Sequence, residues 1–415
     1  MAALPEATIL QDLSKRTRRR HRVFGLVALV TSTLGALMAE ELYLRSAGPD
    51  WLELRMRELT AGSAQSFGSD AAWPIERRDG RILRFEPGAE LTIQNVEYRK
   101  TAHFDELGAR VTSEKRGRAP LVPVLGDSFT FGIGVEDDET FASHLALESG
   151  RHVVNLGVPE FSLKEELDVI ELRHEELGSP PLYVIAAYAG NDLYETWSRR
   201  AQPALGSGEP RSPPWYVRVN ALVNRHPLLR KSYLLQFSRQ SLLTLLDPSR
   251  KTGMDFFFRL IGDRALLEEC IRIYSKQMER LERLAREKSF DTIFVVIPAK
   301  YQIDQAQFEA KTAYYEMDGT RIDPHMPTRA LVEIYEQFGV PVIDASSCLQ
   351  KSGSVATLYY VQDSHLTSSG HRAFARCLID EDILERIDLT DKAENVVRLI
   401  SPRTVLVSPQ PSRAP

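Results

Sequence analysis

The sequence predicts an α/β protein, a three-layer α/β/α sandwich around a mainly parallel five-stranded sheet, and two observations carry this prediction. From residue 120 onward, short apolar runs alternate with longer segments whose apolar residues recur at helical spacing, which is the pattern of βαβ units. The chain has 415 residues, 43% apolar and 26% charged, so it can bury a sizeable core. Because crossovers between parallel strands are right-handed, we expect helices on both faces of the sheet.

The first candidate strand shows how the individual elements are identified. Residues 121–125 are apolar and the run stops at Gly126, as expected where a buried parallel strand enters a tight turn. The same criteria give strands at 121–125, 152–156, 182–188, 292–297 and 340–343, and helices at 140–147, 163–177, 264–288, 328–338 and 368–384.

The connection between the third and fourth strands is too long for a simple crossover. About a hundred residues lie between them, so we expect an insertion at about residues 198–262 within a domain of residues 119–390. Its Pro- and Gly-rich first part predicts a loop. Its later apolar and aromatic residues predict helices that pack on the sheet, and a lid is the alternative.

The N-terminus combines a basic segment with an uncharged one. Residues 1–22 are rich in Lys and Arg, although the whole chain has a net charge of −5. Residues 23–39 carry no charge and would span roughly 26 Å as a helix, close to a hydrocarbon thickness of about 30 Å. By the positive-inside rule, we expect a cytoplasmic arm followed by a single transmembrane helix. A cleaved signal peptide is the main alternative, and a buried soluble helix is a weaker one.

Two further segments flank the predicted domain. Residues 40–118 are expected to begin as a juxtamembrane helix and to continue as a small extension with β-prone pieces at 81–85 and 90–96. The function of this extension cannot be derived from its sequence. Residues 391–415 contain several prolines and are expected to form a loosely held tail.

The chain has three cysteines, Cys270, Cys348 and Cys377, which lie far apart in sequence. Their spacing fits neither a disulfide framework nor a metal knuckle. Buried free thiols are the favoured interpretation. A bridge such as Cys348 to Cys377 in an oxidising compartment is the alternative.

Three short blocks carry the residue types that acyl transfer requires. The first is VLGDSFTFG, residues 124–132, in which Ser128 lies where a predicted strand passes into a helix. This is the edge of an open α/β sheet at which ligands bind. The other two are Gly190-Asn191-Asp192 and Asp363-Ser364-His365. Together they offer a nucleophile, a side-chain amide and a histidine base in one chain order.

These blocks resemble those of the SGNH (GDSL-type) hydrolases, in particular membrane-anchored bacterial members. The serine of the first block is Ser128, the glycine of the second is Gly157, and the asparagine of the third is Asn191. The last pair is Asp363 and His365, and the matches span residues 120–384. Two positions depart from the family pattern. One residue separates Asp363 from His365 where two are usual, and Glu160 stands where the second block usually has another glycine.

The resemblance and elementary chemistry assign the same roles. Ser128 would be the nucleophile and His365 the base that takes its proton. Asp363 would orient the imidazole, although its short spacing leaves a backbone carbonyl as an alternative partner, which would make a dyad. The backbone N–H groups of Ser128 and Gly157 and the amide of Asn191 would form the oxyanion hole.

The remaining polar candidates are interpreted as structural. Asp127 and Asp192 are expected to accept hydrogen bonds from loop backbone, and His371 to lie at the start of the last helix. The charges from Lys164 to Glu176 are expected to form a solvated helix face. The other histidines lack metal-ligand spacing and no phosphate-binding glycine pattern follows a strand, so neither metal nor cofactor is expected.

The sequence therefore predicts a serine esterase that acts through an acyl-Ser128 intermediate. Its expected substrate is an acylated, in particular acetylated, carbohydrate or another envelope ester, and we expect no nucleic-acid partner. The catalytic domain would lie outside the cytoplasm, held by the N-terminal helix at a bacterial inner membrane. One alternative is an O-acyltransferase of an exopolysaccharide system, because relatives with the short Asp-x-His spacing include such enzymes. The second alternative is a non-catalytic, membrane-tethered binding or assembly component.

Overall fold

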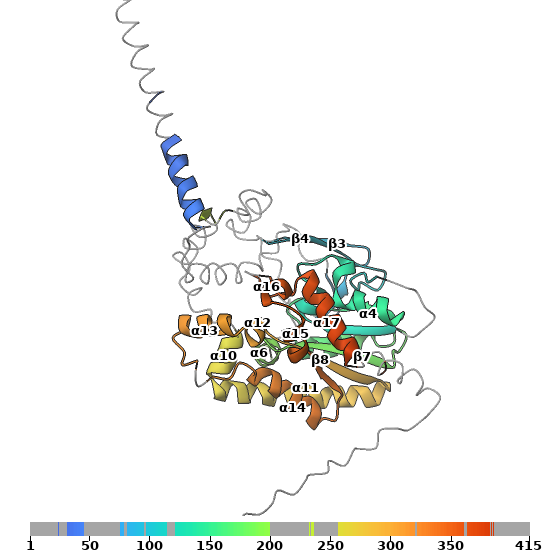
Figure 1. Ribbon diagram of the computed structural model, residues 1–415. Coiled ribbons are helices and arrows are strands. Elements are labelled where there is room, and N and C mark those ends of the chain that lie inside the picture. Colours follow the sequence, from blue (N-terminus) through green and yellow to red (C-terminus); the bar gives the residue numbers. More distant parts are fainter. Residues whose placement is uncertain are drawn as a thin grey trace, which may run out of the picture.

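The computed structural model of the chain is shown in Figure 1. It describes residues 24, 31–44, 75–78, 81–94, 97–113, 121–199, 232, 234–235, 256–319, 322–360, 363–381, 383 and 385. The predicted basic arm, the C-terminal tail and most of the predicted insertion lie outside the described residues.

The centre of the molecule is a parallel sheet of five strands in the order β6-β5-β7-β8-β9. β5, the first of these five strands in the chain, thus lies between two neighbours. The next strand, β6, is on one side of it, and β7, β8 and β9 follow on the other side. In such a sheet the switch point lies between β5 and β7, which are in register at Val124 and Val184. The strands are β5 (Leu121–Gly126), β6 (His152–Asn155), β7 (Leu182–Tyr188), β8 (Asp291–Ile297) and β9 (Val342–Asp344).

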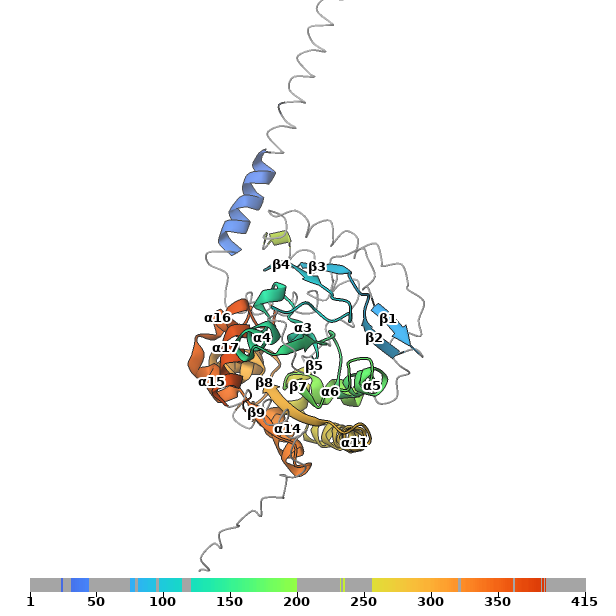
Figure 2. The ribbon, with the colours of Figure 1, turned by 90° about the vertical axis from the view of Figure 1, so that its right-hand side faces the viewer.

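Helices cover both faces of this sheet (Figure 2). Alternate side chains of β7 enter two different apolar cores, with Tyr183 and Ile185 in one and Val184 and Ala186 in the other. The first core is closed by α5 (Leu163–Arg173), α11 (Arg264–Lys288) and α14 (Met326–Gln337), and the second by α4 (Phe141–Ser149), α15 (Ser346–Ser352) and α17 (Ser368–Asp380).

Shorter helices connect these layers. Of the predicted insertion, the structure describes helix α10 (Phe256–Gly262), in which Phe257 and Phe258 are buried in the second core. This placement fits helices that extend the core. The other short helices are α3 (Ser128–Phe131), the 3₁₀ turn η1 (Asp137–Glu139), α6 (Asp192–Ser198), α12 (Lys300–Ile303), α13 (Gln305–Tyr314) and α16 (Val355–Leu358).

The sequence located all five strands of this sheet, and its prediction of a mainly parallel α/β fold is confirmed. The largest shift is at β9, which begins at Val342 although the apolar run begins at Val340. Helix α5 ends at Arg173, four residues before the predicted end at 177, because residues 174–178 form a turn that closes at Gly178, whose φ is 79°.

The extension before the sheet is built from two antiparallel hairpins. They consist of β1 (Ile75–Arg78) with β2 (Arg81–Phe85), and β3 (Glu90–Gln94) with β4 (Arg99–His103). The apolar alternation predicted the second and third of these strands. It missed β1 and β4, which consist mostly of charged and polar residues.

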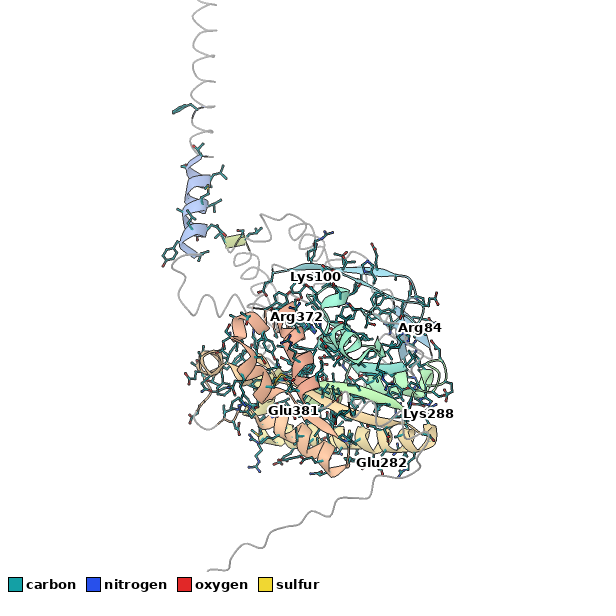
Figure 3. The ribbon with its side chains drawn as sticks, turned by 45° about the vertical axis from the view of Figure 1, so that its right-hand side comes forward. Arg84, Lys100, Glu282, Lys288, Arg372 and Glu381 are labelled. Atoms are coloured by element: carbon teal, nitrogen blue, oxygen red, sulfur yellow. A yellow bond between two sulfur atoms is a disulfide. The ribbon has the colours of Figure 1, made fainter. Side chains whose placement is uncertain are left out.

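The extension packs into the core of the sheet domain. The ring of Phe85 stacks on Phe104 at 4.1 Å and tilts against Phe131 of α3 at 5.5 Å. At the surface, Arg84 donates to Glu176 over 2.6 Å, on the side of the molecule where Lys288 also projects (Figure 3). The extension therefore shares its apolar core with the sheet domain.

The N-terminal region contributes one helical segment to the described residues, 31–44. Near its end, the Glu41 carboxylate accepts hydrogen bonds from the Ser232 hydroxyl at 2.9 Å and from the Leu234 N–H at 2.8 Å. The predicted transmembrane span 23–39 lies partly outside the described residues. Within the part of the chain that the structure describes, no helix has both the length and the apolar character needed to cross a membrane.

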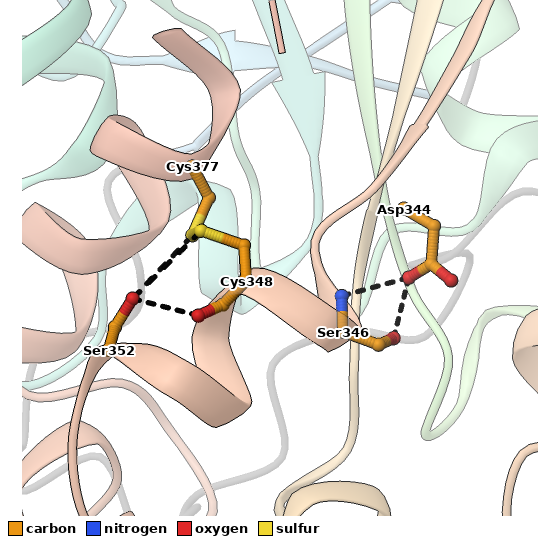
Figure 4. The surroundings of a disulfide bond; sticks show 5 residues. All are labelled: Asp344, Ser346, Cys348, Ser352 and Cys377. Atoms are coloured by element: carbon orange, nitrogen blue, oxygen red, sulfur yellow. Dashed lines mark hydrogen bonds between the residues drawn. A yellow bond between two sulfur atoms is a disulfide. The ribbon is translucent and has the colours of Figure 1, made fainter. Parts of the chain in front are cut away.

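A disulfide joins Cys348 to Cys377, so the favoured interpretation of free thiols is wrong for these two residues (Figure 4). The fold brings them together because α15 and α17 lie side by side on one face of the sheet, which the sequence separation of 29 residues does not reveal. Cys270 is a buried free thiol, as expected.

Removing this bridge is expected to destabilise the domain. A cross-link that closes a loop of this length restricts the unfolded chain and contributes about 2–4 kcal/mol. The double variant Cys348→Ser/Cys377→Ser should therefore unfold at a lower urea concentration than the oxidised wild type. Wild type treated with a thiol reductant is the matched control and should move to the same midpoint. Equal midpoints for oxidised and reduced wild type would contradict the prediction.

Candidate active site

Ser128 is the first residue of α3, directly after β5 at the switch point of the sheet. The turn requires Gly126, whose φ is 152°, because a Cβ there would lie 2.8 Å from the carbonyl oxygen of Ala186. The Asp127 carboxylate then caps α3 by accepting the N–H of Phe129 at 2.8 Å. The strand, the glycine and the cap together hold the Ser128 hydroxyl at the carboxyl edge of the sheet.

His365 reaches this hydroxyl from the other end of the chain. Its Nε2 lies 2.7 Å from Oγ of Ser128, a hydrogen-bonding distance. Its Nδ1 is hydrogen-bonded to Oδ1 of Asp363, which also accepts the backbone N–H of His365 at 3.0 Å. The structure thus brings together the three predicted residues, and the partner of Nδ1 is the carboxylate despite the short spacing. One intervening residue suffices because Asp363 folds back on its own loop.

The electrostatics of this row favour a charged imidazole. Burial by itself lowers the pKa of His365, but the nearby Asp363 carboxylate outweighs it, and the pKa is raised above its ordinary value. Burial alone would raise the pKa of Asp363. The charge of His365 and hydrogen bonds from His365 and Tyr98 overcome this effect and hold the pKa of Asp363 well below its ordinary range. Asp363 therefore stays ionised beside the base.

The predicted oxyanion donors have different surroundings. Ser128 is in the first turn of α3, where backbone N–H groups have no partner within the helix. The amide Nδ2 of Asn191 lies 3.4 Å from Oδ2 of Asp127, a long contact that leaves its second N–H to point elsewhere. The N–H of Gly157 donates to Oδ1 of Asn155 at 3.0 Å. Of the three predicted donors, Gly157 is therefore already engaged in this structure.

Asn155 and Gly157 fasten the end of β6 to α3. The side-chain amide of Asn155 donates to the carbonyl of Thr130 at 2.8 Å. A Cβ on Gly157 would lie 2.3 Å from the backbone nitrogen of Phe131, so only glycine allows this approach. Glu160, where a second glycine was expected, has a φ of 67° in the left-handed region, which explains why glycine suits that position.

Arg110, from the extension, holds the other end of α3. Its buried guanidinium donates to the carbonyls of Phe131, Gly132 and Val135 at 2.6–2.7 Å. It also forms a 2.9 Å ion pair with Asp137. These bonds satisfy carbonyl oxygens that the short helix leaves open, and they fix the loop that follows the nucleophile. No motif indicates this role, because three of the four partners are backbone carbonyls.

Several carboxyl groups are buried close to Asp127, the residue before Ser128. Their burial corrects the expectation of a solvated helix face at residues 164–176. Glu166 of α5 is 2% exposed, and Asp192 and Glu195 of α6 are buried near it. The Asp192 carboxylate accepts the N–H of Tyr188 at 3.0 Å. The negative charge of Asp127 contributes to raising the pKa of Glu166, Asp192 and Glu195. The charged residues of this segment predicted a solvated face because the sequence does not show that α11 and the extension cover α5.

Burial dominates the ionisation of these groups. Burial, followed by repulsion from neighbouring carboxylates, raises the pKa of Glu166 and of Asp192 well above the ordinary values. Burial likewise raises the pKa of Glu195, although Arg199 opposes it. For Asp127, burial raises the pKa to about 6, against the N–H of Phe129 and the charge of His365. Burial thus shifts the ionisation of all four groups toward the protonated form.

The structure also reveals contacts to Asp363 that no motif indicated. The phenol of Tyr98 donates to Oδ2 of Asp363 at 2.6 Å, and the carboxylate of Glu97 accepts the N–H of Asp363 at 2.7 Å. Both residues come from the loop between β3 and β4. His371, by contrast, lies in α17 as expected and accepts the N–H of Phe141 at 3.2 Å. Within the described ranges, no group of three or more His, Cys, Asp or Glu residues is arranged to hold a metal ion.

Comparison with known proteins finds similar structures only at low identity. No protein-family model matches the sequence, and none of the curated proteins matches it. A member of the lipolytic G-D-S-L family from Veillonella parvula is 14% identical, with a TM-score of 0.34 over 63% of this chain and 97% of that one. A lipase/acylhydrolase from Enterococcus faecalis is 12% identical, with a TM-score of 0.35 over 65% and 97%. A variant of an acetyl-xylooligosaccharide esterase from Geobacillus is 13% identical, with a TM-score of 0.34 over 64% and 95%.

The buried Glu166 makes the stability of the domain depend on pH. A carboxyl group whose pKa is raised in the folded state keeps a proton that the unfolded chain has released above about pH 4.5, so its contribution to stability falls as the pH rises. The variant Glu166→Gln is neutral at every pH. The free energy of unfolding of Glu166→Gln minus that of wild type should therefore be about 1–3 kcal/mol larger at pH 8 than at pH 5, because only wild type loses stability as the pH rises.

The measurement is urea unfolding at both pH values. Glu287→Gln, an exposed position on α11, is the matched control and should follow wild type at both. The prediction fails if Glu166→Gln loses as much stability between pH 5 and pH 8 as wild type does.

Proposed function

We propose that this chain is a serine esterase that cleaves ester bonds through an acyl-Ser128 intermediate. The observation that carries the proposal is the continuous hydrogen-bonded row from Ser128 through His365 to Asp363. A serine hydroxyl is a weak nucleophile at neutral pH and gains reactivity from a base within hydrogen-bonding reach. A base whose other nitrogen is fixed by a buried carboxylate has the geometry that acyl transfer needs.

The reaction follows from these positions. Oγ of Ser128 attacks the carbonyl carbon of the ester while Nε2 of His365 takes the hydroxyl proton. The negative charge that develops on the carbonyl oxygen is met by the N–H of Ser128 and the amide of Asn191. His365 then protonates the departing alcohol, and acyl-Ser128 remains. A water molecule, deprotonated by His365, attacks the acyl-enzyme and releases the acid.

Gly157 can serve as a third donor if its N–H is shared between Asn155 and the oxyanion. In the present structure this N–H is at 3.0 Å from Oδ1 of Asn155, so the N–H of Ser128 and the amide of Asn191 are the principal donors of the proposed oxyanion hole.

The substrate and the location belong to the same proposal. The expected substrate is an acylated carbohydrate or another envelope ester, with acetyl as the acyl group, and the sequence resemblance described above supports it. The basic residues before the uncharged span 23–39 support a cytoplasmic N-terminus, a membrane anchor and an extracytoplasmic catalytic domain. A disulfide between Cys348 and Cys377 is compatible with an oxidising compartment.

An activated serine is expected to react with a serine-directed fluorophosphonate. The full-length wild type should be labelled, and Ser128→Ala and His365→Ala should not be. Turnover of a small acetyl ester should fall at least about 10²- to 10⁴-fold in His365→Ala, the usual contribution of a general base. Ser149→Ala and His152→Ala are the matched controls, at partly exposed positions away from the carboxyl edge of the sheet. Folded wild type that is neither labelled nor active would refute the esterase and favour a binding component.

The proposed topology is expected to place the C-terminus outside the cytoplasm, because the Lys- and Arg-rich residues 1–22 are held inside. A reporter enzyme that is active only in the periplasm, fused after Pro415 of the full-length chain, should give signal in a bacterial host. A reporter that is active only in the cytoplasm, fused at the same residue, is the control and should stay silent. The reverse pattern would overturn the topology.

A further inference from the structure

The carboxylate of Asp363 is held from two sides that belong to different parts of the chain. On one side, Oδ1 is bonded to Nδ1 and to the backbone N–H of His365. On the other side, the phenol of Tyr98 donates to Oδ2 at 2.6 Å. Tyr98 is 265 residues away in sequence, on the loop between β3 and β4 of the extension. Both oxygens of the buried carboxylate are thus satisfied.

The loop that carries Tyr98 is fitted closely to the loop that carries Asp363. The Glu97 carboxylate accepts the N–H of Asp363 at 2.7 Å, so the dipeptide Glu97-Tyr98 binds both the backbone and the side chain of Asp363. The ring of Tyr98 packs against Tyr360 with centroids 4.8 Å apart. Tyr360 in turn donates its hydroxyl to the carbonyl of Gly134 at 2.6 Å.

Gly134 explains how two aromatic rings fit at this point. A Cβ at this position would lie 2.6 Å from Cε2 of Tyr360 and 3.0 Å from Cε1 of Tyr98. Its φ of 92° is also in a region that favours glycine. The Gly-Ile-Gly sequence after the nucleophile, which fits no phosphate-binding pattern, therefore makes room for Tyr98.

We propose that Tyr98 is a positioning residue for the reaction, and that the extension thereby supplies a fourth member of the hydrogen-bonded row. This inference rests on the proposed function. Without the phenol, Oδ2 would lose a charge-assisted hydrogen bond inside a buried site, which is costly, so the carboxylate would turn toward another donor. His365 would then lose its fixed partner, and its Nε2 would point at Ser128 for a smaller fraction of the time.

Tyr98 is suited to this role because it stays a donor. Burial, and then the negative charge of Asp363, raise the pKa of Tyr98 well above its ordinary value, so the phenol remains protonated. The charged and titratable groups that act on the pair are Asp363, Asp127 and Lys300 around His365, and Glu97 and Tyr360 around Tyr98. None of these is changed by replacing the Tyr98 hydroxyl with hydrogen.

The test compares Tyr98→Phe with Tyr360→Phe in the full-length protein. Each variant removes one buried hydroxyl and keeps its ring, but only the first hydroxyl reaches Asp363. A hydrogen bond to a charged group is worth enough for kcat of Tyr98→Phe on a small acetyl ester to fall about tenfold or more, with KM near the wild-type value. Tyr360→Phe should keep kcat within about twofold, and both variants should melt at similar temperatures.

A second readout separates positioning from general stability. The negative charge of Asp363 beside the imidazole is what raises the pKa of His365, so a carboxylate that turns away lets this pKa fall toward its ordinary value. The rising limb of kcat/KM with pH, which reports neutral His365, should therefore move to lower pH in Tyr98→Phe and not in Tyr360→Phe. The NMR titration of the His365 ring, in protein with ¹⁵N-labelled histidine, should move in the same direction.

The outcomes distinguish the two hypotheses. Wild-type kcat together with an unchanged His365 titration in Tyr98→Phe would overturn the positioning role. An equal fall of kcat and melting temperature in both variants would also overturn it. If wild type shows neither turnover nor fluorophosphonate labelling, the proposed esterase fails, and the NMR titration still decides whether Tyr98 controls Asp363 and His365.

Discussion

The site depends on one constraint, the placement of His365 within hydrogen-bonding distance of Ser128, 237 residues earlier in the chain. The loop that carries His365 is therefore fastened at both ends. Before it, the N–H of Tyr360 donates to the carbonyl of His365 at 3.0 Å, and after it, the N–H of Thr367 donates to Leu358 at 2.9 Å. The disulfide adds a covalent link between α15 and α17, the helix that follows this loop. A loop held in this way loses little entropy when it orders the imidazole for reaction.

The extension is the second support of the site. It clamps the carbonyls after the nucleophile through Arg110 and contacts Asp363 through Tyr98, so it touches both ends of the hydrogen-bonded row. Its apolar residues Phe85 and Phe104 share the main core. The loop after Ser128 and the loop that carries Asp363 and His365 are far apart in the chain, and both contact the extension that precedes them. This arrangement explains why a sheet domain that begins at residue 121 is accompanied by two hairpins that are not part of its sheet.

What the sequence could predict follows from how local each signal is. The strands of the sheet and the place of Ser128 are set by apolar runs and a glycine turn, and these are visible in a few neighbouring residues. The burial of Glu166 and the pairing of Cys348 with Cys377 depend on which helices become neighbours, so they could not be read from spacing. Tyr98 was missed for the same reason. A lone tyrosine after an apolar strand signals packing, and only the fold shows that its hydroxyl meets a carboxylate.

The raised pKa values of the buried carboxyl groups are related to the charges that develop in the proposed reaction. In the proposed reaction, positive charge develops on His365 and negative charge on the carbonyl oxygen of the substrate near Asn191. Ionised Asp363 stabilises the first of these charges. Ionised Glu166, Asp192 and Glu195 would repel the second, because all three are close enough to Asp127 to feel its charge. Burial and the neighbouring carboxylates raise the pKa of each of these three groups, which shifts them toward their neutral forms, in which that repulsion is absent. Within the hydrogen-bonded row, the negative charge lies on Asp363, on the side of His365 that faces away from Ser128.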